Sequence, residues 1–117
     1  MNPIKNLSDE QKIAVMQTGY QLLVSAAGRQ LDKRDDPSID IILEYCGFRK
    51  ESISGHIGNI FWAKAIKTNP YTAFDMVKRM TYEQKIGVKE MLDCLANKDN
   101  VLLRKDIANQ LKILLML

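Results

Sequence analysis

Aspartates in two segments of the chain have the right chemistry to bind a divalent cation. They are Asp32, Asp35 and Asp36 in GRQLDKRDDP at 28–37, and Asp99 and Asp106 in NKDNVLLRKD at 97–106. Carboxylate oxygens suit Ca²⁺, but that ion takes about six to eight oxygen ligands, and neither segment has the spacing of an EF-hand loop. Acids at these places also cap helices or lie in first turns. We therefore expect no cofactor, and a divalent cation is the alternative.

The sequence carries no recognisable catalytic motif. His56 is the single histidine, and there is no GxSxG, HExxH or P-loop. Ser54 and His56 lie two residues apart, so on a helix they point to different sides and cannot act together as nucleophile and base. Cys46 and Cys94 are expected to be buried free thiols. No enzymatic activity is predicted.

The stretch EYCGFRKESISGHIGNIF has features of a helix-turn-helix over 39–61, with Gly47 in the turn. In this alternative, the residues that contact DNA are Arg49, Lys50, Ser52 and His56. Residues 49–89 hold eight Lys and Arg against three Asp and Glu, a local net charge of +5. Gly55 and Gly58, however, suit close helix packing better than a stiff recognition helix. Nucleic acid is the less favoured partner, and any DNA binding should be weak and electrostatic.

A group of aromatic and basic residues is a candidate surface for binding a protein. The group consists of Trp62, Tyr71, Lys64 and Lys67. Phe61 belongs to the apolar stripe of its helix, so Trp62 beside it points toward the flank. Tryptophan and tyrosine are enriched at protein interfaces, although a half-exposed tryptophan also packs at the edge of a core. An unknown protein is therefore the favoured partner.

Helical periodicity predicts a single all-α domain over 1–117, a compact bundle of five or six helices. The predicted helices begin near residues 8, 36, 52, 69, 81 and 102. Their caps are expected at or near Ser8, Asp36, Asn69 and Thr81. The third helix has a predicted buried stripe of Ile53, Ile57, Ile60, Phe61 and Ala65. The longest apolar stripes belong to 13–27 and 82–96, so these two helices are expected to pack together.

Two segments of the sequence resemble each other. SDEQKIAV at 8–15 and TYEQKIGV at 81–88 share EQKI, a capping hydroxyl and a valine two places after the isoleucine. Each opens a helix that is followed by an acidic turn and another helix. Capping boxes resemble one another by necessity, so the match indicates either a shared local motif or a duplicated helix, acidic loop, helix unit.

This arrangement resembles the TerB-like proteins of the tellurite-resistance group. In the second loop, Asp99 stands for the family's aspartate, Asn100 for its glycine and Asp106 for the acid that opens the next helix. In the first loop, Gly28 is kept, but Ala27 stands where the aspartate would be. The resemblance implies an all-α interaction module without enzymatic activity, whose acidic loops bind a metal ion or a partner.

Composition indicates an ordinary globular protein, with 46% hydrophobic and 26% charged residues. No apolar run reaches the length of a signal peptide or a membrane span, so a cytoplasmic protein without membrane insertion is expected. The segment LKILLML at 111–117 has more apolar residues than one helix face holds. Burial of this helix at the centre of the bundle is expected. A homodimer through Met116 and Leu117 of the C-terminal helix is the alternative.

Overall fold

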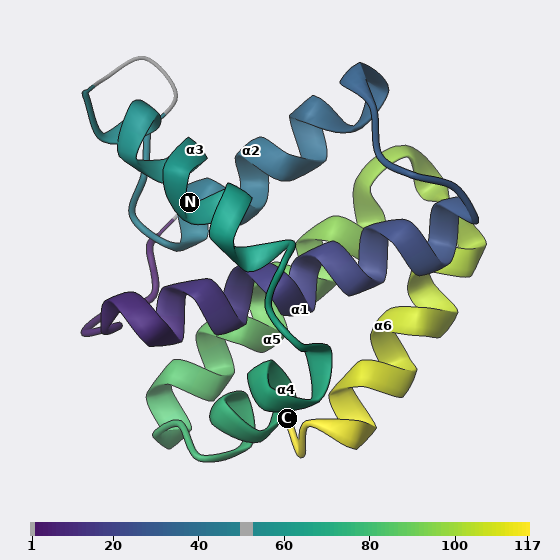
Figure 1. The fold of residues 1–117 in the computed structure, drawn as a ribbon. Coiled ribbons are helices and arrows are strands. Elements are labelled where there is room, and N and C mark those ends of the chain that lie inside the picture. The colour runs from purple at the N-terminus through teal and green to yellow at the C-terminus, as the bar shows by residue number, and fades with distance from the viewer. Residues whose placement is uncertain (1, 50–52) are drawn as a thin grey trace.

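The structure, a computed structural model, describes residues 2–49 and 53–117. Within these ranges the chain forms helices and no strand, which confirms the predicted all-α bundle (Figure 1). The elements are α1 (Asp9–Ala27), η1 (Lys33–Asp35), α2 (Asp36–Tyr45), α3 (Ile53–Ala65), α4 (Pro70–Lys78), α5 (Tyr82–Asn97), η2 (Lys98–Asn100) and α6 (Leu102–Leu114), where η denotes a single 3₁₀ turn. None of the described helices is long and apolar enough to cross a bilayer.

Three of the four predicted caps are confirmed. Ser8 and Thr81 each form a complete capping box, with Gln11 and Gln84 respectively. The side chain of Asn69 accepts hydrogen bonds from two backbone N–H groups in the first turn of α4. Each cap satisfies donors that would otherwise lack a partner at the start of a helix, which is why the local sequence predicts these starts well.

The predicted start of α2 near Asp36 is confirmed, but no aspartate side chain caps the helix there. Asp36 is the first residue of α2, and Asp35 precedes it without a side-chain hydrogen bond to the helix. The cap lies earlier, because Asp32 accepts a hydrogen bond from the Arg34 N–H and opens the turn η1. Asp35 instead turns back to the Asp32 N–H and to Arg29. The chain therefore enters α2 directly from a capped 3₁₀ turn.

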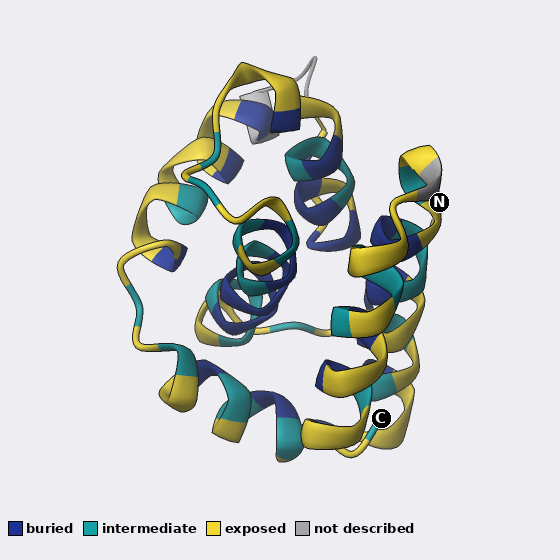
Figure 2. Cartoon of the chain, turned by 90° about the vertical axis from the view of Figure 1, so that its right-hand side faces the viewer, coloured by how far each residue is buried: buried dark blue, intermediate teal, exposed yellow. Residues whose placement is uncertain are grey.

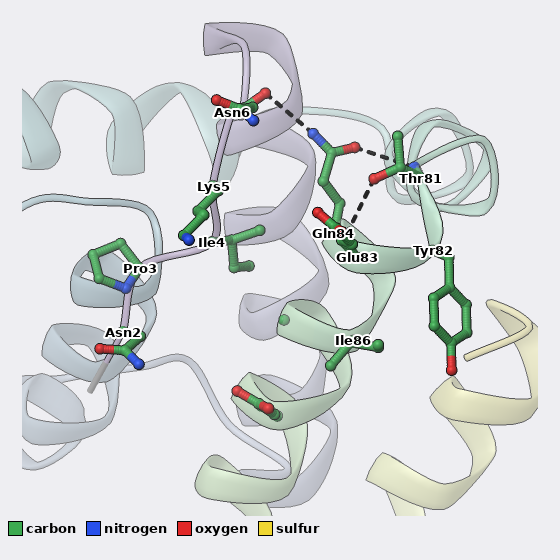
Figure 3. Close-up of a pocket in the computed structure, with 12 residues that line it drawn as sticks. Asn2, Pro3, Ile4, Lys5, Asn6, Thr81, Tyr82, Glu83, Gln84 and Ile86 are labelled. Atoms are coloured by element: carbon green, nitrogen blue, oxygen red, sulfur yellow. Dashed lines mark hydrogen bonds between the residues drawn. The ribbon is translucent and has the colours of Figure 1, made fainter.

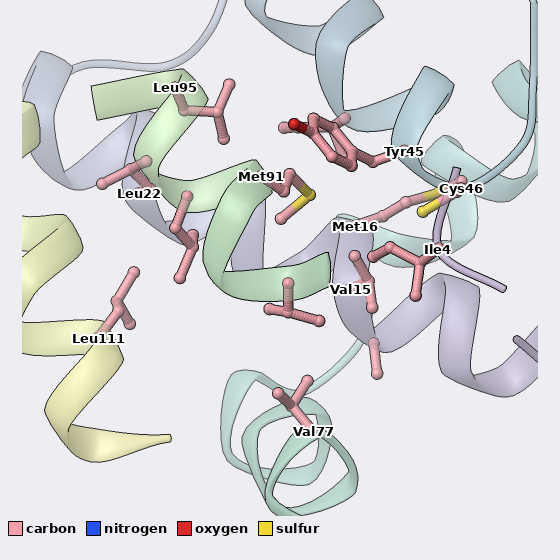
Figure 4. Close-up of a cluster of buried hydrophobic side chains, with 14 of the residues drawn as sticks. Ile4, Val15, Met16, Leu22, Tyr45, Cys46, Val77, Met91, Leu95 and Leu111 are labelled. Atoms are coloured by element: carbon pink, nitrogen blue, oxygen red, sulfur yellow. The ribbon is translucent and has the colours of Figure 1, made fainter. Parts of the chain in front are cut away.

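Helix α1 lies at the centre of the bundle, and the other helices surround it (Figure 2). All residues from 14 to 19 are buried, including Gln17 and Thr18. The expected packing of α1 against α5 is present: Met16 of α1 lies in the same buried cluster as Met91 of α5 (Figure 4). Its most extensive packing is nevertheless with the shorter α4. A central helix is buried on every side, so it packs against several neighbours and not only against the one with the longest apolar stripe.

The predicted buried stripe of α3 is wrong at two positions. Ile57 and Ile60 are 44% and 57% exposed, whereas Gly55 and Gly58 are buried. At Gly58, a Cβ atom would lie 2.9 Å from the Cβ of Phe48, so only glycine allows this approach. Gly58 therefore allows close packing, as expected, and the two isoleucines lie on the outer face of α3. Phe61 and Ala65 are partly and fully buried as predicted, while the side chain of Ile53 lies outside the described part.

The order α1–η1–α2 recurs as α5–η2–α6. The two capping boxes also meet, since Gln84 Nε2 donates to Gln11 Oε1 at 3.4 Å and to the Asn6 carbonyl at 3.1 Å. The helices that open with the shared EQKI motif therefore begin side by side. A duplication agrees with this arrangement and stays a prediction.

Helix α6 lies on the outside of the bundle, so its expected central position is wrong (Figure 1). Leu111 and Leu115 are buried, but Ile113 and Met116 are 80% and 71% exposed. Leu117 is partly buried. One face of the helix is therefore covered, and the homodimer through Met116 and Leu117 stays a prediction.

Candidate interaction surface

The carboxylates of the first acidic turn are bound by arginines. Asp35, which is 4% exposed, accepts two hydrogen bonds from Arg29, at 2.8 and 3.2 Å, and one from the Asp32 N–H at 2.9 Å. Asp32 pairs with Arg34 at 2.7 Å. Hydrogen bonds from the Arg34 side chain and backbone lower the pKa of Asp32 to about 2, and the hydrogen bond from Arg29 lowers the pKa of Asp35. These two carboxylates fix the turn, and a cation would have to compete with the arginines.

The second acidic turn lies at the same end of the molecule as the first. Arg104 of α6 donates to Ser38 Oγ in α2 at 3.1 Å and to the Leu95 carbonyl in α5 at 3.4 Å. The Asp99 carboxylate oxygen Oδ2 lies 3.6 Å from Lys98 Nζ, and Asp106 is exposed on α6. Asp36 is also exposed. Within residues 2–49 and 53–117, no three His, Cys, Asp or Glu side chains converge in a way that could hold a metal ion. The predicted ligands therefore lie at one end of the bundle, but their carboxylates do not come together around one metal position.

We expect Asp35→Asn to lower the free energy of unfolding at pH 7 by about 1–3 kcal/mol, because it weakens charged hydrogen bonds to Arg29. The folded state lowers the pKa of Asp32 and of Asp35. Their contribution is therefore present above the unfolded carboxyl pKa of about 4 and is lost as the pH falls below it. Urea unfolding followed by circular dichroism between pH 7 and pH 2 measures this loss.

Asp106→Asn is the matched control, because that carboxylate is exposed on α6. Asp35→Asn should show a smaller loss of stability on acidification than the wild type, while Asp106→Asn should follow the wild type. Equal stability of Asp35→Asn and wild type at pH 7 would show that the Arg29 pair does not stabilise the turn.

Of the four residues named in the helix-turn-helix alternative, Arg49 and His56 lie in the part of the chain that the structure describes. Among the described residues, α3 packs mainly against α1 and only slightly against α2. Arg49 and His56 are exposed, but the outward face of α3 carries Ile57 and Ile60, which offer no hydrogen bonds to base edges. Lys50 and Ser52 lie outside the described residues. DNA binding stays a hypothesis that rests on the local positive charge.

The predicted protein-binding residues lie around the turn between α3 and α4, which crosses the front of α1 in Figure 1. Tyr71 is 77% exposed, and Lys64 and Lys67 are exposed. Trp62 is partly buried and meets the ring of Tyr20 edge to face, with centroids 5.8 Å apart. Trp62 is therefore held at the edge of this region by its contact with Tyr20, and Tyr71 is the most accessible aromatic side chain of the region.

Three exposed isoleucines belong to the same region. We name the corner surface as the exposed residues Ile57, Ile60, Lys64, Ile66, Lys67 and Tyr71. Ile57, Ile60 and Lys64 are spaced by three and four residues, so they share one face of α3. Sequence reasoning assigned the two isoleucines on α3 to the core and missed them. The glycines at 55 and 58 were the available signal, because a face of small residues also packs well.

Gln17 of the central helix holds the corner surface in place. Its Nε2 donates to the carbonyls of Ala65 and Thr68, the latter at 2.9 Å, where α3 ends and the turn begins. Its Oε1 accepts from Gln21 at 2.7 Å. Gln17 is 1% exposed, so this buried amide has satisfied partners and caps the end of α3 from inside the bundle.

An apolar cleft of about 270 Å³ adjoins the corner surface, between α1 and α4. It is lined by Glu10, Ile13, Ala14, Thr68, Thr72, Ala73 and Met76. Its lining residues Thr68 and Thr72 are the chain neighbours of Lys67 and Tyr71, whose side chains do not line the cleft. A cleft with an apolar lining and a polar rim can take one apolar side chain of a partner.

A larger groove of about 600 Å³ lies elsewhere, between the N-terminal segment and the first turns of α5 (Figure 3). Ile4 fixes that segment, because its N–H donates to the Tyr45 carbonyl at 2.8 Å and its side chain fits over Gly87. The exposed Tyr82 lies at the groove's edge. The groove is lined by residues 2–6 of that segment and by residues of α5 and its cap Thr81.

No protein-family model, curated protein or solved structure matches this sequence.

Proposed function

We propose that the protein is a non-enzymatic, cytoplasmic interaction module that binds a protein partner through the corner surface. The observation that carries this proposal is Tyr71, which is 77% exposed and directly precedes Thr72, a lining residue of the apolar cleft between α1 and α4. Exposed apolar residues scattered singly are common, but a group beside a cleft is typical of a binding site. Aromatic anchors and the pockets next to them contribute most of the affinity in protein interfaces.

The resemblance to the TerB-like proteins belongs to this proposal. It is supported by the repeated order of helix, acidic turn and helix, and by the two acidic turns at one end of the bundle. In this chain a protein partner is favoured over a metal ion, because Asp32 and Asp35 already accept hydrogen bonds from arginines. The acidic turns then shape the bundle rather than bind the partner.

Tyr71→Ala should weaken binding of the partner at least about tenfold, which corresponds to about 1.4 kcal/mol for an aromatic anchor. The partner would be captured with the full-length chain from nuclease-treated lysate of the source cells, identified, purified and titrated against each variant. Nuclease treatment removes proteins that are bridged by DNA, so it separates this function from the DNA-binding alternative.

Tyr82→Ala is a matched control, because Tyr82 is 80% exposed near the start of another helix, α5. The partner should bind this variant and the wild type with the same Kd. If Tyr71→Ala binds as tightly as the wild type, or if both variants lose binding equally, the corner surface is not the binding site.

A further inference from the structure

The charge of the corner surface has one sign. Residues 52–74 contain no Asp or Glu, while Lys64 and Lys67 are both exposed there. A lysine in the last turn of a helix is favoured by the helix dipole, which accounts for Lys64. Lys67 lies beyond the end of α3, so the dipole does not account for it. Two carboxylates lie at the α4 end of this surface: Glu10 of α1 lines the apolar cleft, and Asp75 follows Tyr71 by four residues on α4. The positive charge therefore belongs to the α3 part of the surface, at Lys64 and Lys67.

The shape of the surface suits an elongated, partly apolar segment. Ile57, Ile60 and Lys64 form a stripe along α3 of about 10 Å, from the rise of 1.5 Å per residue. The exposed residues Ile66, Lys67 and Tyr71 follow along the chain in the turn and the start of α4, where Thr68, Thr72 and Ala73 line the apolar cleft. An amphipathic helix presents apolar side chains at three- and four-residue spacing, which matches such a row followed by a pocket.

We propose that the partner presents an acidic amphipathic helix, whose apolar face covers Ile57 and Ile60 and whose carboxylates pair with Lys64 and Lys67. This inference rests on the proposed function and adds the chemistry of the partner. An anionic lipid surface has the same two features, apolar and negative. Electrostatic attachment to lipid takes a cluster of about four to eight Lys or Arg, and the corner surface has two lysines, so a peptide is favoured.

A synthetic 16-residue peptide tests this proposal. Its leucines lie on one helix face, at positions i, i+3, i+4 and i+7, and glutamates occupy the other positions. The control peptide has lysine at every glutamate position. Fluorescence anisotropy of the labelled peptides and emission of Trp62, the single tryptophan, both report binding to the full-length chain. The glutamate peptide should bind, and rising salt should weaken it, because exposed charges are screened.

Lys64→Glu/Lys67→Glu should raise the Kd of the glutamate peptide at least about tenfold. Lys85→Glu/Lys89→Glu makes the same charge change on α5, where Lys89 is exposed, and should leave the Kd unchanged. Equal binding of both peptides, no binding of either, or equal effects of the two double variants would overturn the proposal. Tighter binding to anionic phospholipid vesicles than to the peptide, lost in Lys64→Glu/Lys67→Glu, would assign the surface to lipid and also overturn it.

The two proposals can fail separately. If the captured partner loses affinity for Tyr71→Ala but binds Lys64→Glu/Lys67→Glu as tightly as the wild type, the interaction module is supported and its acidic partner is not. If Tyr71→Ala has no effect on the partner while the peptide still depends on both lysines, the surface binds acidic helices but does not bind that partner.

Discussion

Leu22→Ala should lower the free energy of unfolding by about 2–5 kcal/mol, the range for removing a buried leucine side chain from a packed core. Leu22 lies on the central helix α1 and is fully buried, so the helices around it leave little room for the cavity to collapse. A domain of this size has a total stability of about 5–15 kcal/mol, so this loss is a large fraction of it. Urea unfolding followed by circular dichroism at pH 7 measures the change.

Leu102→Ala is the control for Leu22→Ala, because Leu102 is 74% exposed on α6. Its effect should stay within about 0.5 kcal/mol, as is usual for surface substitutions. If the two variants lose similar stability, α1 is not the centre of the core. If Leu102→Ala alone is strongly destabilised, the exposed face of α6 is covered in solution, and the homodimer alternative gains support.

Gln17→Leu should destabilise the chain and also move the corner surface. The substitution removes the Gln17 donor from the carbonyls of Ala65 and Thr68, and the Ala65 carbonyl keeps the Thr68 N–H. A buried carbonyl that loses its donor costs about 1–3 kcal/mol. Leucine is no smaller than glutamine, so the substitution creates no cavity and the loss of the hydrogen bonds is the expected cause. Urea unfolding measures the stability, and Trp62 emission reports the environment at the end of α3.

The control for Gln17→Leu is Gln110→Leu, which makes the same change at an exposed position of α6. Gln17→Leu should also weaken binding of the partner under conditions where the variant is folded, although Gln17 is buried and cannot touch the partner. Unchanged stability and unchanged Trp62 emission in Gln17→Leu would show that the turn after α3 is held by its own local hydrogen bonds.

Helix starts were predicted where the deciding atoms lie within four residues of one another. The hydroxyls of Ser8 and Thr81 and the amide of Asn69 each satisfy backbone donors in the turn that follows them. The cap at Asp36 was mispredicted by the same local logic, because Arg29 draws the Asp35 carboxylate into a separate capped turn. A competing partner six residues away already lies beyond what a capping pattern contains.

Part of the candidate site was also predictable. Trp62, Tyr71, Lys64 and Lys67 were singled out by residue type, and their region is exposed at Tyr71 and both lysines. Sequence reasoning had no signal for the cleft between α1 and α4, whose lining comes from residues far apart along the chain. It also had none for Gln17, which bonds to carbonyls 48 and 51 residues away.

The sequence by itself determined the all-α class, the positions of most helix ends and the one-signed charge of residues 52–74, because each follows from residue type and short-range hydrogen bonds. Only the tertiary structure decided which face of each helix is covered. Hydrophobicity assigns Ile57 and Ile60 to the core, yet α3 meets Phe48 at Gly58, where a Cβ atom would lie 2.9 Å from its neighbour. The close approach of the Phe48 side chain to the backbone of α3 requires the absence of a side chain at Gly58, so this glycine faces inward and Ile57 and Ile60 lie on the surface.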